Sequence, residues 1–221
     1  MNRILALLRT EIGRKALMGI TGLLLIGFLI SHMLANLLVL FDKDGYNHYS
    51  HNLTSNPLVY LAELGLLVFF VAHFISGILV WQRNRSARPV DYRIKVPADR
   101  TGRKSIASTT MILSGVVMLV FVPLHLETFK FGAWYTTADG EMRDLHRLVI
   151  EVFQSPLYTL WYLVAMPILG AHAWHGFGSG FESLGVSYKR ELRMFGRALA
   201  VVLTIGFMAV PVYVMLGGGA S

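Results

Sequence analysis

Five long apolar stretches of the chain contain no Asp, Glu, Lys or Arg, and they constrain its fold more than any other feature. The stretches are 16–41, 64–82, 105–126, 152–181 and 198–221. Each reaches the roughly 18 apolar residues that a helix needs to cross about 30 Å of hydrocarbon. Their length and their lack of two-residue alternation exclude a transmembrane β-barrel. The sequence therefore predicts an all-α integral membrane bundle of five transmembrane helices, in a single domain over residues 1–221.

Composition and turn signals refine this expectation. Only 15% of the residues are charged, whereas soluble domains contain about 25%. Pro57 follows a turn-rich outer loop and is a good first residue for the second helix. The five helices are expected at about 16–41, 58–82, 105–128, 156–181 and 197–217.

The basic residues predict the orientation of this bundle. Of the 20 Lys and Arg residues, sixteen lie in the alternate segments 1–15, 82–104 and 182–197. The other four are Lys43, Lys130, Arg143 and Arg147. Basic loops stay in the cytoplasm, so we expect the N-terminus in the cytoplasm and the C-terminus outside. The net charge of +7 is then a topology signal and a surface for an acidic partner, and nucleic acid is not an expected partner.

The chain contains no cysteine, which limits the chemistry that it can support. Disulfides, thiolate-bound clusters and covalent c-type haem are excluded. The first apolar run is too long for a signal peptide and lacks a small-residue cleavage site, so we expect it to remain as a membrane helix. Any metal must therefore be held chiefly by histidine.

Five of the eight histidines lie inside the apolar runs. They are His32, His73, His125, His172 and His175. One such histidine is readily explained by a hydrogen bond between helices. Five of them, spread over four helices, favour a function instead, because ionisable residues inside a membrane are costly and usually functional.

The depth of these histidines in the membrane sorts them into two pairs. His73 and His172 each stand nine residues before the cytoplasmic end of their runs, about 14 Å from that end in a helix. His32 and His125 lie in the outer halves of helices that run the other way. The outer match is looser, because His125 is close to the end of its run unless the helix continues past Glu127.

Facing imidazoles in a helix bundle suit the two axial positions of a haem iron. Gly77 and Gly176 stand four residues after His73 and His172, on the same helix face, and leave room for a flat macrocycle. A closed zinc site needs more ligands, and hydrogen bonding to a quinone needs one histidine rather than two matched layers. We therefore expect two non-covalent b-type haems, one above the other in the membrane.

His175 is the alternative to His172 as the inner ligand. His175 follows His172 by three residues, so its side chain points about 60° away from that of His172 around the helix. The residue four positions after His175 is Ser179 rather than glycine. We therefore expect His172 to be the ligand. His175 is left to bond a haem propionate or a neighbouring helix.

Five segments of the chain together resemble a known family. They are GRKALMGITG (13–22), SHMLAN (31–36), HFISG (73–77), PLHLETFKFG (123–132) and HAWHGFGSGFESLG (172–185). In this order they resemble the cytochrome b membrane subunit of succinate:quinone oxidoreductases, in the form where one five-helix subunit carries two haems. The resemblance covers nearly the whole chain. It implies that His32 and His125 hold the outer haem and that His73 and His172 hold the inner haem.

The resemblance also implies partners and a location. The subunit would anchor a flavoprotein and an iron–sulfur protein on the cytoplasmic face of the cell's inner (cytoplasmic) membrane, and the whole complex could form a higher oligomer. Electrons from succinate would reach a quinone, commonly menaquinone, through both haems, while the dicarboxylate chemistry stays in the other subunits. A quinol:fumarate reductase subunit fits equally well. A non-haem transporter or assembly protein is the alternative from a different class, although no internal repeats support it.

Further residues are weaker candidates within this scheme. Glu63, at the outer start of the second helix, is the candidate for proton transfer at a quinone site, with Tyr46, His48 and His51 nearby; an ordinary interfacial carboxylate is as good an interpretation. Ser31 and Asn36 flank His32 and could support it. The candidate partners of the inner haem propionates are Arg14, Lys15 and Lys189, although each is also explained by cytoplasmic anchoring.

Overall fold

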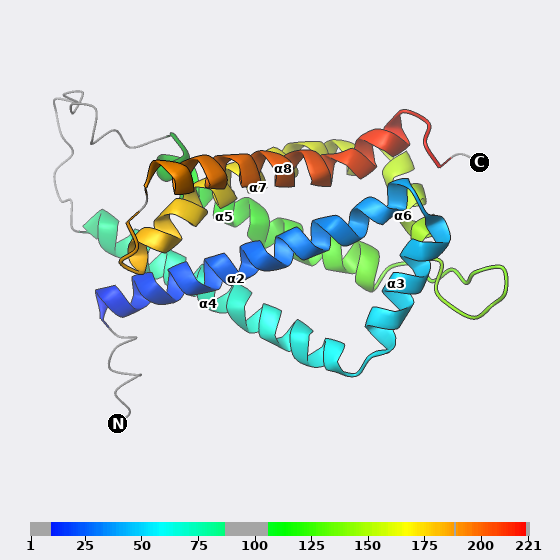
Figure 1. Cartoon of the computed structure of the whole chain (residues 1–221), viewed down its shortest axis with the longest axis horizontal. Coiled ribbons are helices and arrows are strands. Elements are labelled where there is room, and N and C mark those ends of the chain that lie inside the picture. Colours follow the sequence, from blue (N-terminus) through cyan, green and yellow to red (C-terminus); the bar gives the residue numbers. More distant parts are fainter. Residues whose placement is uncertain (1–9, 87–105, 188, 220–221) are drawn as a thin grey trace.

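The computed structural model describes residues 10–86, 106–187 and 189–219, and nearly all of them lie in helices joined by short connections (Figure 1). An isolated β-bridge joins Thr136 to Arg143. Most of the two basic segments 1–15 and 82–104 falls in residues 1–9 and 87–105, which lie outside the described residues.

Five long helices run in alternating directions along the longest axis of the molecule (Figure 1). They are α2 (Glu11–Leu37), α4 (Leu58–Ser86), α5 (Ile106–His125), α7 (Pro156–Ser183) and α8 (Arg190–Met215). The spans that include α2, α4, α5 and α8 are long and apolar enough to cross a membrane. Helix α7 meets the same criterion together with α6 (Leu145–Gln154), from which it is bent by 94°. The described residues therefore contain four helices long and apolar enough to cross a membrane, or five if the bent pair is one span, as in a multi-pass membrane protein.

The helices extend beyond the charge-free runs that predicted them. Helix α2 begins at Glu11 rather than near Ala16, because the Thr10 side chain accepts a hydrogen bond from the Gly13 N–H and caps the helix. Helix α4 continues to Ser86 and α8 begins at Arg190. Absence of charge marks the part of a helix within hydrocarbon, whereas the helices here continue into polar turns.

Helix α5 does not end at its histidine. The five residues Leu126–Lys130 continue it as a turn of π-helix, η2, and the Thr128 hydroxyl donates to the Leu124 carbonyl at 2.8 Å. The helical path thus passes Glu127, which was the condition for placing His125 securely within a helix. Pro123 lies inside the preceding helix, where it removes one backbone hydrogen bond.

The connections that the sequence predicts on the outer side are more helical than expected. The segment predicted as a loop forms α3 (Lys43–Ser55), and the loop prediction is wrong there. The Asp42 side chain caps this helix by accepting from the Gly45 N–H. Tyr46 and Asn47 are both buried, so tertiary contacts hold a segment whose composition favours turns.

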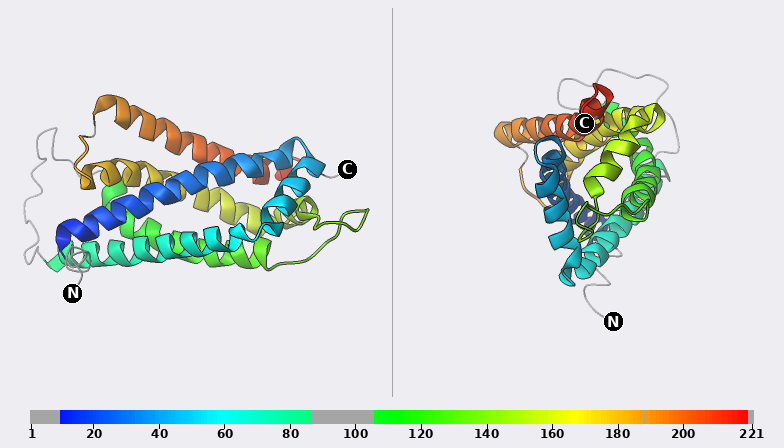
Figure 2. Two further views of the ribbon diagram at one scale, coloured as in Figure 1. Left: turned by 60° about the horizontal axis from the view of Figure 1, so that its bottom comes forward. Right: turned by 90° about the vertical axis from the view of Figure 1, so that its right-hand side faces the viewer.

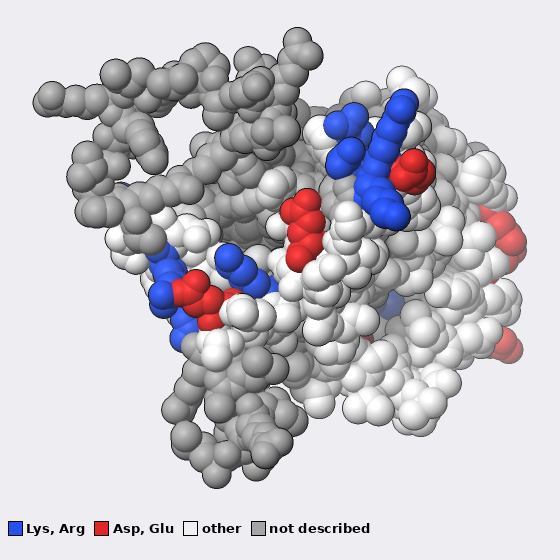
Figure 3. All heavy atoms as spheres, turned by 60° about the vertical axis from the view of Figure 1, so that its left-hand side comes forward, with Lys and Arg blue, Asp and Glu red and all other residues white. Residues whose placement is uncertain are grey.

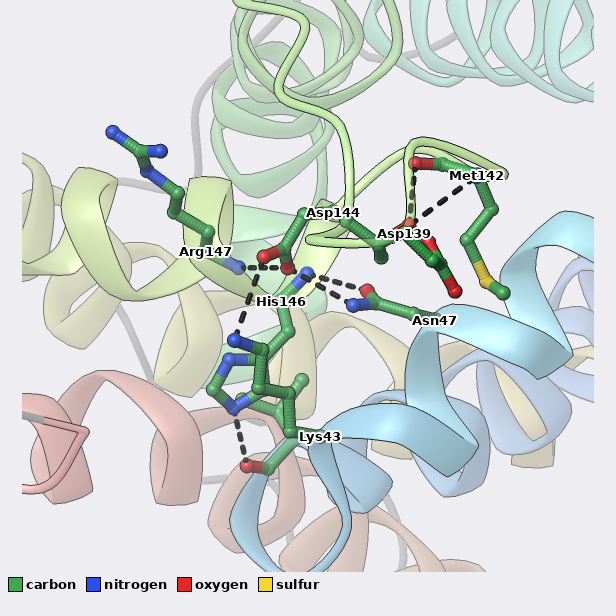
Figure 4. Close-up of polar contacts among 9 residues, drawn as sticks. Lys43, Asn47, Asp139, Met142, Asp144, His146 and Arg147 are labelled. Carbon is green, nitrogen blue, oxygen red and sulfur yellow. Dashed lines mark hydrogen bonds and ion pairs between the residues drawn. The ribbon is translucent and has the colours of Figure 1, made fainter. Parts of the chain in front are cut away.

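Helices α3 and α6 are clamped together by a buried polar network (Figure 4). The Asn47 side chain is 1% exposed. Its amide donates to Asp144 Oδ1 at 2.9 Å and its carbonyl accepts from the His146 N–H at 2.9 Å. Asp144 also caps α6 by accepting from the Arg147 N–H, and it forms an ion pair with Lys43 at 3.5 Å. We call these five residues the outer clamp.

Small residues allow the spanning helices to approach closely. A Cβ atom on Gly19 of α2 would lie 3.0 Å from the Gly180 carbonyl oxygen of α7. Helix α2 packs along α4, α7 and α8 (Figures 1 and 2). In α4, by contrast, only Ser76 is buried. Much of the α4 surface is therefore available to lipid or to a ligand.

Candidate functional site

Four helices place their histidines in two layers. The ring centres of His73 on α4 and His172 on α7 are 6.2 Å apart, with ring planes at 72°. The ring centres of His32 on α2 and His125 on α5 are 5.7 Å apart, with ring planes at 84°. All four side chains are half-buried. The structure thus brings together the same two pairs that depth along the sequence had sorted.

These separations fit a metal held between two imidazoles. A metal–nitrogen bond to histidine is about 2 Å long, so two axial nitrogens on opposite sides of a haem iron lie about 4 Å apart. The ring centres lie about 1 Å behind each nitrogen, which puts them about 6 Å apart. The ring separations of both pairs are close to this value. The separation of the ring centres in each pair is therefore compatible with bis-histidine ligation of one metal ion.

The inner pair has its ring nitrogens arranged for ligation. His73 Nδ1 lies 3.0 Å from the Met18 carbonyl oxygen of α2. A carbonyl oxygen can only accept, so Nδ1 carries the proton and donates it. The Nε2 atom of His73 then keeps its lone pair. This matches the arrangement of metal-binding histidines, whose other ring N–H is usually held by a carbonyl or a carboxylate.

His172 has the same arrangement through a hydroxyl group. Its Nδ1 lies 2.8 Å from Ser114 Oγ on α5. The Ser114 hydroxyl is also 3.0 Å from the Met111 carbonyl, so it can donate to that carbonyl while its oxygen accepts from His172 Nδ1. In that arrangement Nε2 of His172 is unprotonated, as it is in His73.

The outer pair lies among aromatic side chains. His125 stacks on Phe121 with ring planes at 17°, and its Nδ1 is 2.9 Å from the Tyr162 hydroxyl of α7. His32 stacks on Phe28. Within the described residues no hydrogen bond to the His32 ring is found. The outer site is thus more apolar than the inner one.

Asn36 supports the backbone of His32 rather than its ring. Its side-chain amide donates to the His32 carbonyl at 2.8 Å, and its carbonyl accepts from the Tyr46 hydroxyl at 3.2 Å. Burial raises the pKa of Tyr46, and the positive charge of Arg143 lowers it by a smaller amount. Tyr46 therefore remains a neutral hydrogen-bond donor. Ser31 donates to the Phe28 carbonyl and does not contact the histidine ring in any described hydrogen bond.

Glycines shape the space around the inner pair. A Cβ atom on Gly77 or on Gly176 would meet no atom within 4 Å, so open space adjoins both positions. A Cβ atom on Gly22 of α2, by contrast, would lie 2.9 Å from Cε1 of His73. Gly22 therefore makes room for the imidazole itself, while Gly77 and Gly176 border space that a planar ligand could occupy.

His175 is half-buried and belongs to neither pair. It has no ring contact with another histidine among the described residues. The histidines therefore group in twos, and the described part of the chain contains no group of three or more His, Cys, Asp or Glu side chains that could hold a metal ion.

Glu63 is not free in the structure. It forms an ion pair with Lys130 of η2, which lies five residues after His125. The pair thus joins the outer end of α4 to the end of the helix that carries an outer-layer histidine. His48 and His51 are exposed on α3; the only described bond of the His51 ring is at 3.4 Å to Ser55.

The basic candidates lie at the opposite end of the bundle (Figure 3). Arg14 and Lys15 border a small hollow between α2 and α4, beside the Glu11–Arg83 ion pair. Lys189 is exposed at the N-terminus of α8. Arg14 lies one turn before Met18, whose carbonyl holds His73, so Arg14 and Lys15 lie beyond the inner pair toward the N-terminal end of α2.

The polar partners of the histidine rings were not found from the sequence. Ser114, Tyr162 and Met18 are ordinary residues of apolar helices and do not stand out in the sequence. The distance of Ser114 and Tyr162 from the histidine on their own helix could have identified them. Ser114 precedes His125 by eleven residues and Tyr162 precedes His172 by ten, so on antiparallel helices each falls at the level of the other helix's histidine.

Comparison of the chain with protein-family models, with curated proteins and with solved structures found no match.

Proposed function

We propose that this protein is the membrane anchor and dihaem cytochrome b subunit of a succinate:quinone oxidoreductase. The observation that carries the proposal is the pairing of four histidines from four helices at 5.7 and 6.2 Å. Support comes from the bond of His73 Nδ1 to the Met18 carbonyl, which leaves Nε2 of His73 unprotonated, and from the Ser114 hydroxyl, which can accept from His172 Nδ1 in the same way. The resemblance of five segments to that family supplies the kind of complex.

In this proposal His73 and His172 would hold an inner haem b, and His32 and His125 would hold an outer haem b. Gly77 and Gly176 border the space for the inner macrocycle, while Arg14, Lys15 and Lys189 are within the cytoplasmic region where propionates need cationic partners. When bound, the two groups supply one-electron transfer between the cytoplasmic and outer halves of the membrane.

The spacing of the two layers suits that role. Ten or eleven residues separate the inner and outer levels on α5 and α7, which is about 15 Å along a helix. An iron–sulfur partner on the cytoplasmic face would exchange electrons with the inner level, and a quinone, menaquinone by the family resemblance, with the outer one. Glu63, held by Lys130 beside the outer layer, is the proposed proton-transfer group for that quinone.

The same arrangement of histidines would pass electrons in either direction. The equivalent subunit of a quinol:fumarate reductase is therefore the alternative within this proposal. A proton- or metal-translocating transporter is less well supported. Its histidines would need to exchange protons or bind ions along a path, whereas three of the four paired rings here are tied at Nδ1 to a neighbouring group.

Filling the open space beside the inner pair tests this proposal. Gly77→Leu or Gly176→Leu should leave the helices intact, because the new side chain meets no protein atom at its Cβ. Each should remove the inner haem and leave the outer one, as measured by the haem content of the purified protein and by its reduced-minus-oxidised spectrum.

Gly27→Leu is the matched control. Gly27 also borders open space, but it is exposed and stands five residues before His32, which turns it about 140° away on the helix. It should retain both haems. Retention of two haems by Gly77→Leu and Gly176→Leu as well would contradict the assignment of the inner site.

A further inference from the structure

Helices α5 and α7 hold each other's histidines. Ser114 of α5 bonds the ring of His172 on α7, and Tyr162 of α7 bonds the ring of His125 on α5. The two contacts are 2.8 and 2.9 Å long and both involve Nδ1. The arrangement is reciprocal because the helices are antiparallel and the interval from hydroxyl to histidine is nearly equal on both.

We propose that Ser114 and Tyr162 are positioning residues that set the ring orientation and the redox potential of one haem each, Ser114 for the inner haem and Tyr162 for the outer haem. This inference rests on the proposed haem-binding function. Each hydroxyl group would act by bonding the histidine ring and would not contact the haem itself.

The direction of the effect follows from hydrogen-bond chemistry. A group that accepts the Nδ1 proton makes the imidazole more basic and fixes its rotation and tautomer. A more basic axial ligand stabilises the ferric state relative to the ferrous state, and so lowers the potential. With iron at Nε2 of His172, the ring proton is on Nδ1 and Ser114 Oγ accepts it, while the Ser114 hydroxyl can donate to the Met111 carbonyl at 3.0 Å. With iron at Nε2 of His125, the Tyr162 oxygen accepts in the same way.

The other two histidines lack this reciprocity. His73 on α4 is held by α2, through the Met18 carbonyl at 3.0 Å and the Thr21 hydroxyl at 3.4 Å. For His32 on α2, the described part of α4 supplies no such contact. Each haem would therefore have one ligand whose orientation depends on a hydroxyl of the α5–α7 pair, and a single substitution can address each haem separately.

Redox titration of the whole protein, monitored by optical and electron paramagnetic resonance spectra, tests the proposal. Ser114→Ala should shift the midpoint potential of the inner haem to a more positive value and alter its g-anisotropy, with the outer haem unchanged. Tyr162→Phe should do the same to the outer haem alone. Ser114→Thr, which keeps the hydroxyl, should restore the inner potential. The His172→Ala protein, which keeps the outer haem, identifies which signal is which.

Two variants serve as matched controls. Thr204→Val removes a hydroxyl that donates only to the Ala200 carbonyl of its own helix in the described contacts. Tyr158→Phe removes a phenol one turn before Tyr162 on α7. Neither should shift either potential.

Several outcomes are decisive. Loss of the inner haem from Ser114→Ala but not from Ser114→Thr would also support the proposal, since the ligand would then be unheld. Unchanged potentials in Ser114→Ala and Tyr162→Phe, with two haems present, would overturn it, as would a shift of the wrong haem. A wild-type protein without haem would instead overturn the proposed function, so the two failures are distinguishable.

Discussion

At the scale of single residues, position along a helix predicted more than residue type. Eight histidines are equivalent as letters, yet counting from the ends of the apolar runs paired His73 with His172 and His32 with His125, and the structure places these rings together. The ring partners could not be predicted in this way. Which serine or tyrosine meets a histidine depends on the rotation of two helices about their axes, and apolar sequence on all sides of a helix does not specify that rotation.

The choice between His172 and His175 is testable at this scale. Because His172 faces His73 and His175 does not, His172→Ala should reduce the haem content from two per chain to one, while His175→Ala should leave two. Pyridine haemochrome assay of both purified variants measures this. One haem in His175→Ala and two in His172→Ala would reverse the assignment.

At the scale of elements, the spanning helices were predictable and their ends and outer connections were not. Long apolar runs determine where a helix crosses hydrocarbon, whatever the rest of the fold does. Helix α3 was missed because its composition is polar and rich in turn formers. Helix α3 is stabilised by the burial of Asn47 against the start of α6. Asn47 and Asp144 are 97 positions apart, so a local sequence pattern cannot predict their contact.

The outer clamp should therefore stabilise the protein substantially. Asn47→Ala removes two buried hydrogen bonds and leaves the His146 N–H and one Asp144 oxygen without that partner. A buried polar group left unpaired costs about 1–3 kcal/mol, so the free energy of unfolding should fall by about that amount. Thermal unfolding in detergent measures it, with Asn52→Ala on the exposed side of α3 as the control. Equal stability of the two variants would show that the clamp contributes little.

Asp144 gives the clamp a pH dependence. Burial alone would raise the pKa of Asp144, but hydrogen bonds from the Arg147 N–H and the Asn47 amide, together with the charge of Lys43, lower it below its ordinary value of 3.8. A carboxylate whose pKa is lower in the folded state stabilises the fold above its unfolded pKa, and this contribution is lost as the pH falls through the folded pKa. We expect thermal stability to decrease below about pH 4, with a shallower decrease in Asp144→Asn. Parallel acid profiles would contradict this role.

At the scale of the whole molecule, the helix bundle places its paired histidines at two levels and carries charged residues at both ends. The sequence predicted the all-α class of fold and the two histidine levels. It could not predict that α6 bends by 94° from α7, since Ser155 and Pro156 permit a break at that point without specifying its angle. The central claim is that both levels hold haem b.

The haem stoichiometry of the purified wild-type chain tests that claim most directly. A dithionite-reduced minus oxidised spectrum should show b-type haem, and the pyridine haemochrome assay should give two haems per chain. One haem per chain would mean that one of the two histidine pairs is not a haem site. A chain that binds no haem would contradict the account.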